Sequence, residues 1–183
     1  KSDYLKKINH FFNTFNTEIM AYNVYNFKNN PLLNYPKKSC YLNTKEEIFS
    51  SISSVSFVIS NKEKIMFDTN LGLGSKSIYQ SGEETDLIIR SFKKLNYKIY
   101  FKKTIKIFHN EKNYPILSQM KKSFYYGCGW SYVAKKNGLG FQFIIKNIFL
   151  IILNFGFNLI SLNFLKSLNS LSTFMGRIFG LIY

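Results

Sequence analysis

Residues 82–95 constrain the fold more than any other stretch, because they carry helix signals at both ends. Gly82 or Ser81 can cap this helix at its start. The first turn then holds Glu83, Glu84 and Asp86, and the last turn holds Lys93 and Lys94. Acids at the amino end and cations at the carboxyl end complement the helix dipole. The sequence therefore predicts a helix over residues 83–95.

Hydrophobic periodicity predicts helices and strands on both sides of this helix. Helices are expected at 3–16 and from 115 to about 136, and strands at 18–27, 52–59, 98–102 and 104–109. The apolar run 55–59 is typical of a buried strand. Hydroxyl residues crowd the preceding run 50–54, which is typical of a polar strand end. This alternation predicts an α/β fold.

The chain is strongly basic, with a formal net charge of +15 at pH 7. Such charge suits nucleic acid, an anionic membrane surface or phosphorylated substrates, and does not choose among them. Most of the excess is Lys scattered through Asn-rich sequence, so a biased genome explains it equally well. Cys40 and Cys128 match no metal or redox spacing and are expected to be reduced thiols.

The last part of the chain has a different composition. Residues 141–160 are nearly all Phe, Ile and Leu, with Asn147, Asn154 and Asn158 on one helical stripe. This run is marginal for a spanning helix, which needs about 20 apolar residues. In residues 164–182 one face is apolar, and Lys166 and Arg177 lie on the other. That period predicts a helix in a membrane interface, and a core-packing helix has the same period.

The three acids of the 83–95 helix point in different directions at about 100° per residue. Glu84 shares the apolar face with Leu87 and Ile88, Asp86 points oppositely toward Arg90, and Glu83 lies on the flank. A carboxylate at the inner edge of a helix start is partly desolvated, which suits a general base. Glu84 is the predicted base, with Glu83 and Asp86 as further catalytic candidates. Simple compensation of the dipole is the alternative for all three.

Three segments in order resemble a family two glycosyltransferase. They are the loop Phe-Asp-Thr-Asn-Leu-Gly-Leu-Gly at 67–74, Gly-Glu-Glu at 82–84 and the strand end Lys-Ile-Phe-His at 106–109. The resemblance covers roughly residues 14–133. It implies the GT-A (Rossmann-like) fold, with Glu84 in the last position of the family's Gly-Glu-Asp motif.

The resemblance also implies a divalent cation, Mg²⁺ or Mn²⁺, with His109 as a ligand. The family's Asp-x-Asp motif, which holds the same ion, is absent from the chain. The nucleotide-binding half is therefore expected to lie outside it, and this fragment alone is expected to be inactive.

Substrate contacts are expected around the glycine loop. Gly72 and Gly74 permit the close backbone approach that a loop over a sugar diphosphate needs, although a plain turn is an equal alternative. In the resemblance Asp68 braces this loop. The stretch Tyr-Gly-Cys-Gly at 126–129 resembles the family's Tyr-Gly-Arg-Gly. Since Cys replaces Arg, Lys121 and Lys122 are the expected phosphate contacts.

The resulting hypothesis divides the chain into an acceptor and catalytic half at 1–113, a connecting helix at 114–138 and membrane-associated helices at 139–183. The predicted activity is inverting transfer of a sugar from a nucleotide donor to a glycan or lipid-linked acceptor, in surface polysaccharide synthesis. The expected location is the cytoplasmic face of a bacterial membrane, without nucleic acid as a partner. A basic nucleic-acid-binding module and a non-catalytic membrane scaffold are the alternatives.

Overall fold

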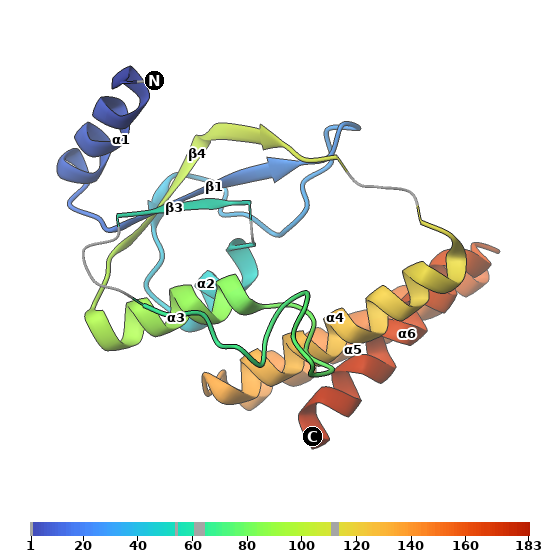
Figure 1. Ribbon diagram of the computed structural model, residues 1–183. Helices are drawn as coiled ribbons and strands as arrows, with labels where there is room; N and C mark the ends of the chain where they lie inside the picture. The colour runs from blue at the N-terminus through green and yellow to red at the C-terminus, as the bar shows by residue number, and fades with distance from the viewer. Residues whose placement is uncertain (1, 54, 61–64, 111–113) are drawn as a thin grey trace. The chain divides into compact units, whose positions relative to one another are not determined.

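The computed structural model describes residues 2–53, 55–60, 65–110 and 114–183, which form six helices and four strands (Figure 1). The helices are α1 (Ser2–Thr14), α2 (Lys45–Ser51), α3 (Glu83–Leu95), α4 (Ile116–Lys136), α5 (Phe141–Ile160) and α6 (Phe164–Ile182). The strands are β1 (Ile19–Tyr25), β2 (Cys40–Tyr41), β3 (Phe57–Ile59) and β4 (Ile99–Phe108). The chain is therefore mixed α/β, as predicted.

Contacts within the chain define two compact units. Unit 1 comprises Lys1–Met66 and Leu87–Glu111, and unit 2 comprises Phe67–Asp86 and Lys112–Tyr183. The glycine loop and the first turn of α3 thus belong with the carboxy-terminal helices. The predicted boundary at residue 113 falls outside the described residues.

Unit 1 is built on a four-stranded mixed sheet of order β2-β4-β1-β3. Its central strands β1 and β4 are parallel, with Ile19 opposite Ile99, and each edge strand pairs antiparallel with its neighbour. The register of β1 on β4 shifts after Tyr22. There the amide of Asn23 donates to the carbonyls of Lys103 and Ile105. That side chain satisfies backbone groups that the irregularity leaves without a ladder partner.

Alternation along β1 explains how the sheet is covered on its α1 side. Met20 and Tyr22 pack with Phe12 of α1 in one apolar cluster. Ile19, Ala21 and Val24 are fully buried. Successive side chains of a strand point to opposite faces. Figure 1 shows α2 and α3 on the side of the sheet away from α1.

Unit 2 is a three-helix arrangement in which α4 and α6 run parallel, with α5 as the return helix. The amide of Asn169 donates to Gln119 near the start of both helices, and Lys135 reaches the carbonyl of Leu181 at their ends. Gly176 faces the α4 backbone so closely that a Cβ there would overlap the carbonyl oxygen of Phe124. Because glycine has no side chain, these two helices can touch along their backbones at this point.

Arg177 lies inside this arrangement and corrects one prediction. Its guanidinium stacks 3.8 Å from the ring centre of Trp130 and donates to the carbonyl of Asn147 at 2.9 Å. Burial lowers the pKa of Arg177 to about 10. The expectation that Arg177 lines the polar surface of α6 is wrong, because that side of α6 packs against α4 and α5.

The helices predicted at 83–95, 141–160 and 164–182 are confirmed at their stated ends. By length and composition alone α5 could cross a membrane. Among the described helices it is the one that is long and apolar enough. The two strands predicted at 98–102 and 104–109 are one strand, β4. Its pairing with β1 continues across the register shift.

The strand predicted at 52–59 is wrong over most of its length. Residues 45–51 form α2, whose start has a capping box: Thr44 accepts from the Glu47 backbone at 3.1 Å, and the Glu47 carboxylate accepts from the Thr44 backbone at 3.2 Å. Only Phe57–Ile59 pairs with β1. Val55 is 36% exposed, so the run 55–59 is not the buried strand expected. Residue 54 of the hydroxyl run lies outside the described residues.

Candidate functional site

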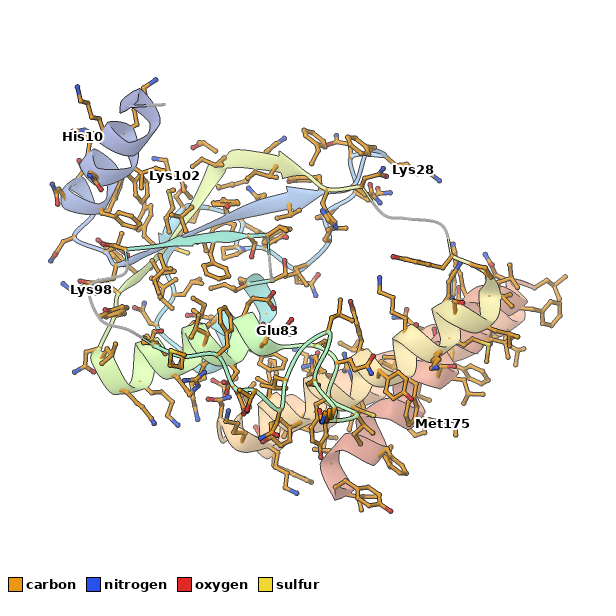
Figure 2. The ribbon with its side chains drawn as sticks, in the orientation of Figure 1. His10, Lys28, Glu83, Lys98, Lys102 and Met175 are labelled. Atoms are coloured by element: carbon orange, nitrogen blue, oxygen red, sulfur yellow. The ribbon has the colours of Figure 1, made fainter. Side chains whose placement is uncertain are left out.

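The candidate site lies in unit 2, where the glycine loop meets the first turn of α3. Figure 2 shows Glu83 at the start of that helix. Gly82 has φ of 90°, and its carbonyl accepts from the backbone of Asp86 at 2.8 Å. Glycine adopts this conformation without steric strain, so the chain can enter α3 directly from the loop.

Gly72 brings the loop against the acids. Its φ is 92°, and a Cβ built there would lie 2.6 Å from the carboxyl carbon of Glu83. Its backbone N–H donates to the carbonyl of Tyr79 at 2.9 Å and closes the loop. Gly74 has φ of 98° with open space around it. The positive φ favours glycine at both positions, and at Gly72 a larger residue would also displace the flexible Glu83 side chain.

Glu84 lies in the first turn of α3, next to Glu83. It is half-buried. Burial raises its pKa above the ordinary value, its own backbone N–H opposes that shift, and the neighbouring charge of Glu83 raises the pKa further. A carboxylate with a raised pKa holds a proton more readily once it has accepted one. The prediction that Glu84 lies on the partly desolvated edge of the helix is confirmed.

Tyr126 of α4 is a further group beside these acids. Burial raises the pKa of its phenol, and the charges of Glu83, Tyr114 and Glu84 act in the same direction. Lys122 places its ammonium 5.2 Å from the Tyr126 ring centre and 5.0 Å from that of Tyr114. A phenol, two carboxylates and an ammonium group thus share one neighbourhood.

Asp86 was placed opposite the apolar face of α3, and the structure shows that this side of the helix start is also buried. Its side chain is fully buried and accepts from the amide of Asn137 at 2.9 Å and from the ammonium of Lys136 at 3.0 Å. The helical period places residues relative to α3 alone. The carboxyl end of α4 packs on the side of α3 opposite its apolar face and supplies the partners of Asp86. Asp86 therefore anchors the first turn of α3 and is poorly placed to be a base.

Lys136 joins this anchor to the glycine loop. Its ammonium also contacts the carboxylate of Asp68 at 2.6 Å. Burial lowers the pKa of Lys136, but its hydrogen bonds to Asp68 and Asp86 outweigh that effect and leave the pKa raised. Asp68 itself accepts from the backbone of Asn70 at 2.9 Å. This arrangement gives Asp68 the bracing position expected of it.

Lys121 and Lys122, the expected phosphate contacts, are exposed on α4. Lys121 lies over the ring of Tyr125, with 6.0 Å to its centre, and Lys122 lies over Tyr126 as described above. Aromatic rings hold both ammonium groups by cation–π attraction. Their charges stand at the surface, where an anion could reach them.

His109 follows β4 in unit 1, and its backbone N–H donates to the carbonyl of Tyr25 at 2.8 Å. Its ring is exposed. Within the described residues, no three His, Cys, Asp or Glu side chains form a group that could hold a metal ion. A single histidine supplies one ligand of the several that Mg²⁺ or Mn²⁺ requires.

Sequence reasoning missed Lys136 and Asn137, which it treated only as the end of a helix. One signal was available. An Asp in the first helical turn, followed by an apolar run, needs a polar partner if that turn is buried.

Comparisons of the chain with models of protein families, with curated proteins and with solved structures found no match.

Proposed function

We propose that this chain is the carboxy-terminal part of an inverting glycosyltransferase of the GT-A fold. It transfers a sugar from a nucleotide-diphosphate donor to a glycan or lipid-linked acceptor, in surface polysaccharide synthesis at the cytoplasmic face of a bacterial membrane. The observation that carries the proposal is Glu84, a half-buried carboxylate with a raised pKa on the turn where a glycine loop meets a helix start.

Glu84 acts as the base in this proposal. Its carboxylate takes the proton of the acceptor hydroxyl while that oxygen bonds to the anomeric carbon of the donor sugar. The bond from the anomeric carbon to the diphosphate oxygen breaks, and its electron pair leaves with the nucleoside diphosphate. Direct attack on the face opposite the leaving group inverts the anomeric configuration.

The surrounding residues support this role by position and charge. Gly72 lets the loop backbone approach closely, and the Lys136 contact to Asp68 holds that loop against α4. Lys121 and Lys122 can attract the negative diphosphate. The Glu83 charge helps to raise the pKa of Glu84, so Glu83 tunes the base in the proposal.

A divalent cation would neutralise charge on the departing diphosphate. His109, which belongs to unit 1, is proposed as one of its ligands. Because the described residues supply no complete ligand set, no step of the proposed reaction is derived through the ion.

The test uses the chain together with any residues that precede Lys1 in its gene. Release of nucleoside diphosphate is measured across a panel of nucleotide sugars, and donor binding is measured by calorimetry. Glu84→Gln should reduce transfer by about 10²-fold or more while donor binding persists. Glu46→Gln is the matched control, since Glu46 is also a half-buried acid in the first turn of a helix. Unreduced turnover by Glu84→Gln would refute the assignment.

A further inference from the structure

Large apolar side chains stand exposed along the outer sides of α5 and α6. This outer apolar face consists of Ile145, Phe149, Leu153 and Phe157 on α5, and Leu168, Leu171, Met175, Ile178 and Ile182 on α6. Phe157 is 70% exposed, and Met175, labelled in Figure 2, is 55% exposed. Single exposed apolar residues are ordinary, but so many of them along two packed helices indicate an interaction site.

The internal packing of α6 indicates what surrounds it. Ser172, Gly176 and Gly180 follow each other at four-residue intervals and are buried. Gly176 and Gly180 touch the backbone of α4. A helix of a water-soluble bundle turns its large apolar residues inward and its small or polar ones outward. In α6 this order is reversed, as in helices that pack against each other in lipid.

Helix α4 separates α6 from the polar loop of the candidate site. Its residues that touch the loop segment 67–86 are Gly129, Tyr132, Val133, Lys136 and Asn137. Its residues that touch α6 are Phe124, Gly127, Cys128, Ser131 and Lys135. At about 100° per residue these two sets lie on opposite sides of α4. Within unit 2, polar and apolar surfaces are therefore stacked in layers.

Charge is distributed in a way that favours an anionic partner. From residue 112 to residue 183 the chain contains Lys and Arg but no Asp or Glu. Lys146 near the start of α5 and Lys166 near the start of α6 are exposed. Long lysine side chains can extend from an apolar surface toward charged headgroups. The same helices thus offer apolar area and positive charge together.

Amides on α5 are compatible with lipid because they bond within the helix. The side chain of Asn147 donates to the carbonyl of Phe143 at 2.9 Å, and that of Asn158 donates to Asn154 at 2.7 Å. An amide donor that is already bonded is less costly to remove from water.

We infer that the outer apolar face of α5 and α6 docks on a lipid bilayer containing anionic lipids. The two helices lie in one leaflet, and α4 stands between α6 and the loop segment 67–86. Helix axes pack about 8–10 Å apart, so this loop is held roughly 20 Å above the docked face. The inference does not depend on glycosyl transfer, since it uses only the packing and charge of unit 2.

The experiment measures co-sedimentation of the full chain with vesicles of phosphatidylcholine alone and of phosphatidylcholine mixed with phosphatidylglycerol. Phe157→Gln should weaken binding to both vesicles by about tenfold, because it removes a large apolar side chain from the docked face. Leu73→Gln is the matched control. Leu73 is 73% exposed but belongs to the loop segment on the other side of α4, so binding should be unchanged. Lys146→Gln should weaken binding to the mixed vesicles about fivefold and leave phosphatidylcholine alone unaffected.

Release of the bound chain by alkaline carbonate is expected for helices that lie in one leaflet. Resistance to carbonate would overturn the orientation inferred here. Absence of binding to either vesicle would overturn the docking itself, as would equal losses from Phe157→Gln and Leu73→Gln. A self-association in light scattering that Phe157→Gln abolishes, without any vesicle binding, would assign the face to a second copy instead. Fluorescence of Trp130, which packs against Phe143 and Arg177, checks that each variant keeps its fold.

Discussion

Replacing Gly176 by Ala tests the backbone contact between α4 and α6. Helix propensity alone predicts that Gly→Ala in a helix interior stabilises the protein by about 1 kcal/mol. At Gly176 the new methyl group would overlap the Phe124 carbonyl, and backbone atoms cannot move aside as a flexible side chain can. Overpacking of this kind costs about 1–3 kcal/mol. It should also cancel the gain in propensity, so the variant should be less stable than the parent.

Gly156 is the matched control, because it lies in α5 and a Cβ added there would meet no atom within 4 Å. Gly156→Ala should keep the full propensity gain. Thermal unfolding is followed by the fluorescence of Trp130, the single Trp of the chain. At about 2–4 °C per kcal/mol, Gly156→Ala should raise Tm by a few degrees and Gly176→Ala should lower it by up to several degrees. Equal stabilisation by both variants would refute the close approach of α4 and α6.

Three further predictions concern Glu84, Lys136 and His109. Burial raises the pKa of Glu84, so burying its ionised form costs stability at neutral pH. Glu84→Gln removes this cost and should raise Tm at pH 7. The gain should vanish below about pH 4.5, where both side chains are neutral. Lys136→Met should destabilise the fold by about 2–3 kcal/mol in urea unfolding, because it leaves the buried Asp86 carboxylate without its ammonium partner. The loss is limited because the Asn137 amide still donates to Asp86. The pKa of Lys136 is raised, so this difference should be complete below pH 10.5 and decline as pH rises through the raised value, whereas Lys135→Met should change stability by under 1 kcal/mol. His109→Ala should raise the Mn²⁺ concentration needed for activity, and an unchanged metal titration would remove His109 from the proposed ligands.

Helices whose ends or apolar faces are marked by neighbouring residues could be predicted from the local sequence. Acids and lysines at its two ends placed α3, and an apolar period placed α6. The capping box at Thr44 and Glu47 was equally local and could have predicted α2. Strand β4 was divided in two because its continuity depends on β1, a partner far away in the chain.

The candidate site likewise contains residues whose environment is predictable from local sequence and residues whose environment depends on distant segments. Glu84 could be placed on a partly desolvated edge from the helical period alone, since that period determines which residues share a face of α3. The environment of Asp86 could not, because Lys136 and Asn137 come from a helix that begins many residues later. Arg177 likewise lies inside unit 2, because the glycines of α6 let α4 pack closely on that side of the helix. The large apolar side chains of α6 are then left on its exposed side. The helical period shows which side chains share a face, whereas burial also depends on the element that packs against that face. Which faces are covered therefore follows from contacts between distant segments and not from the period.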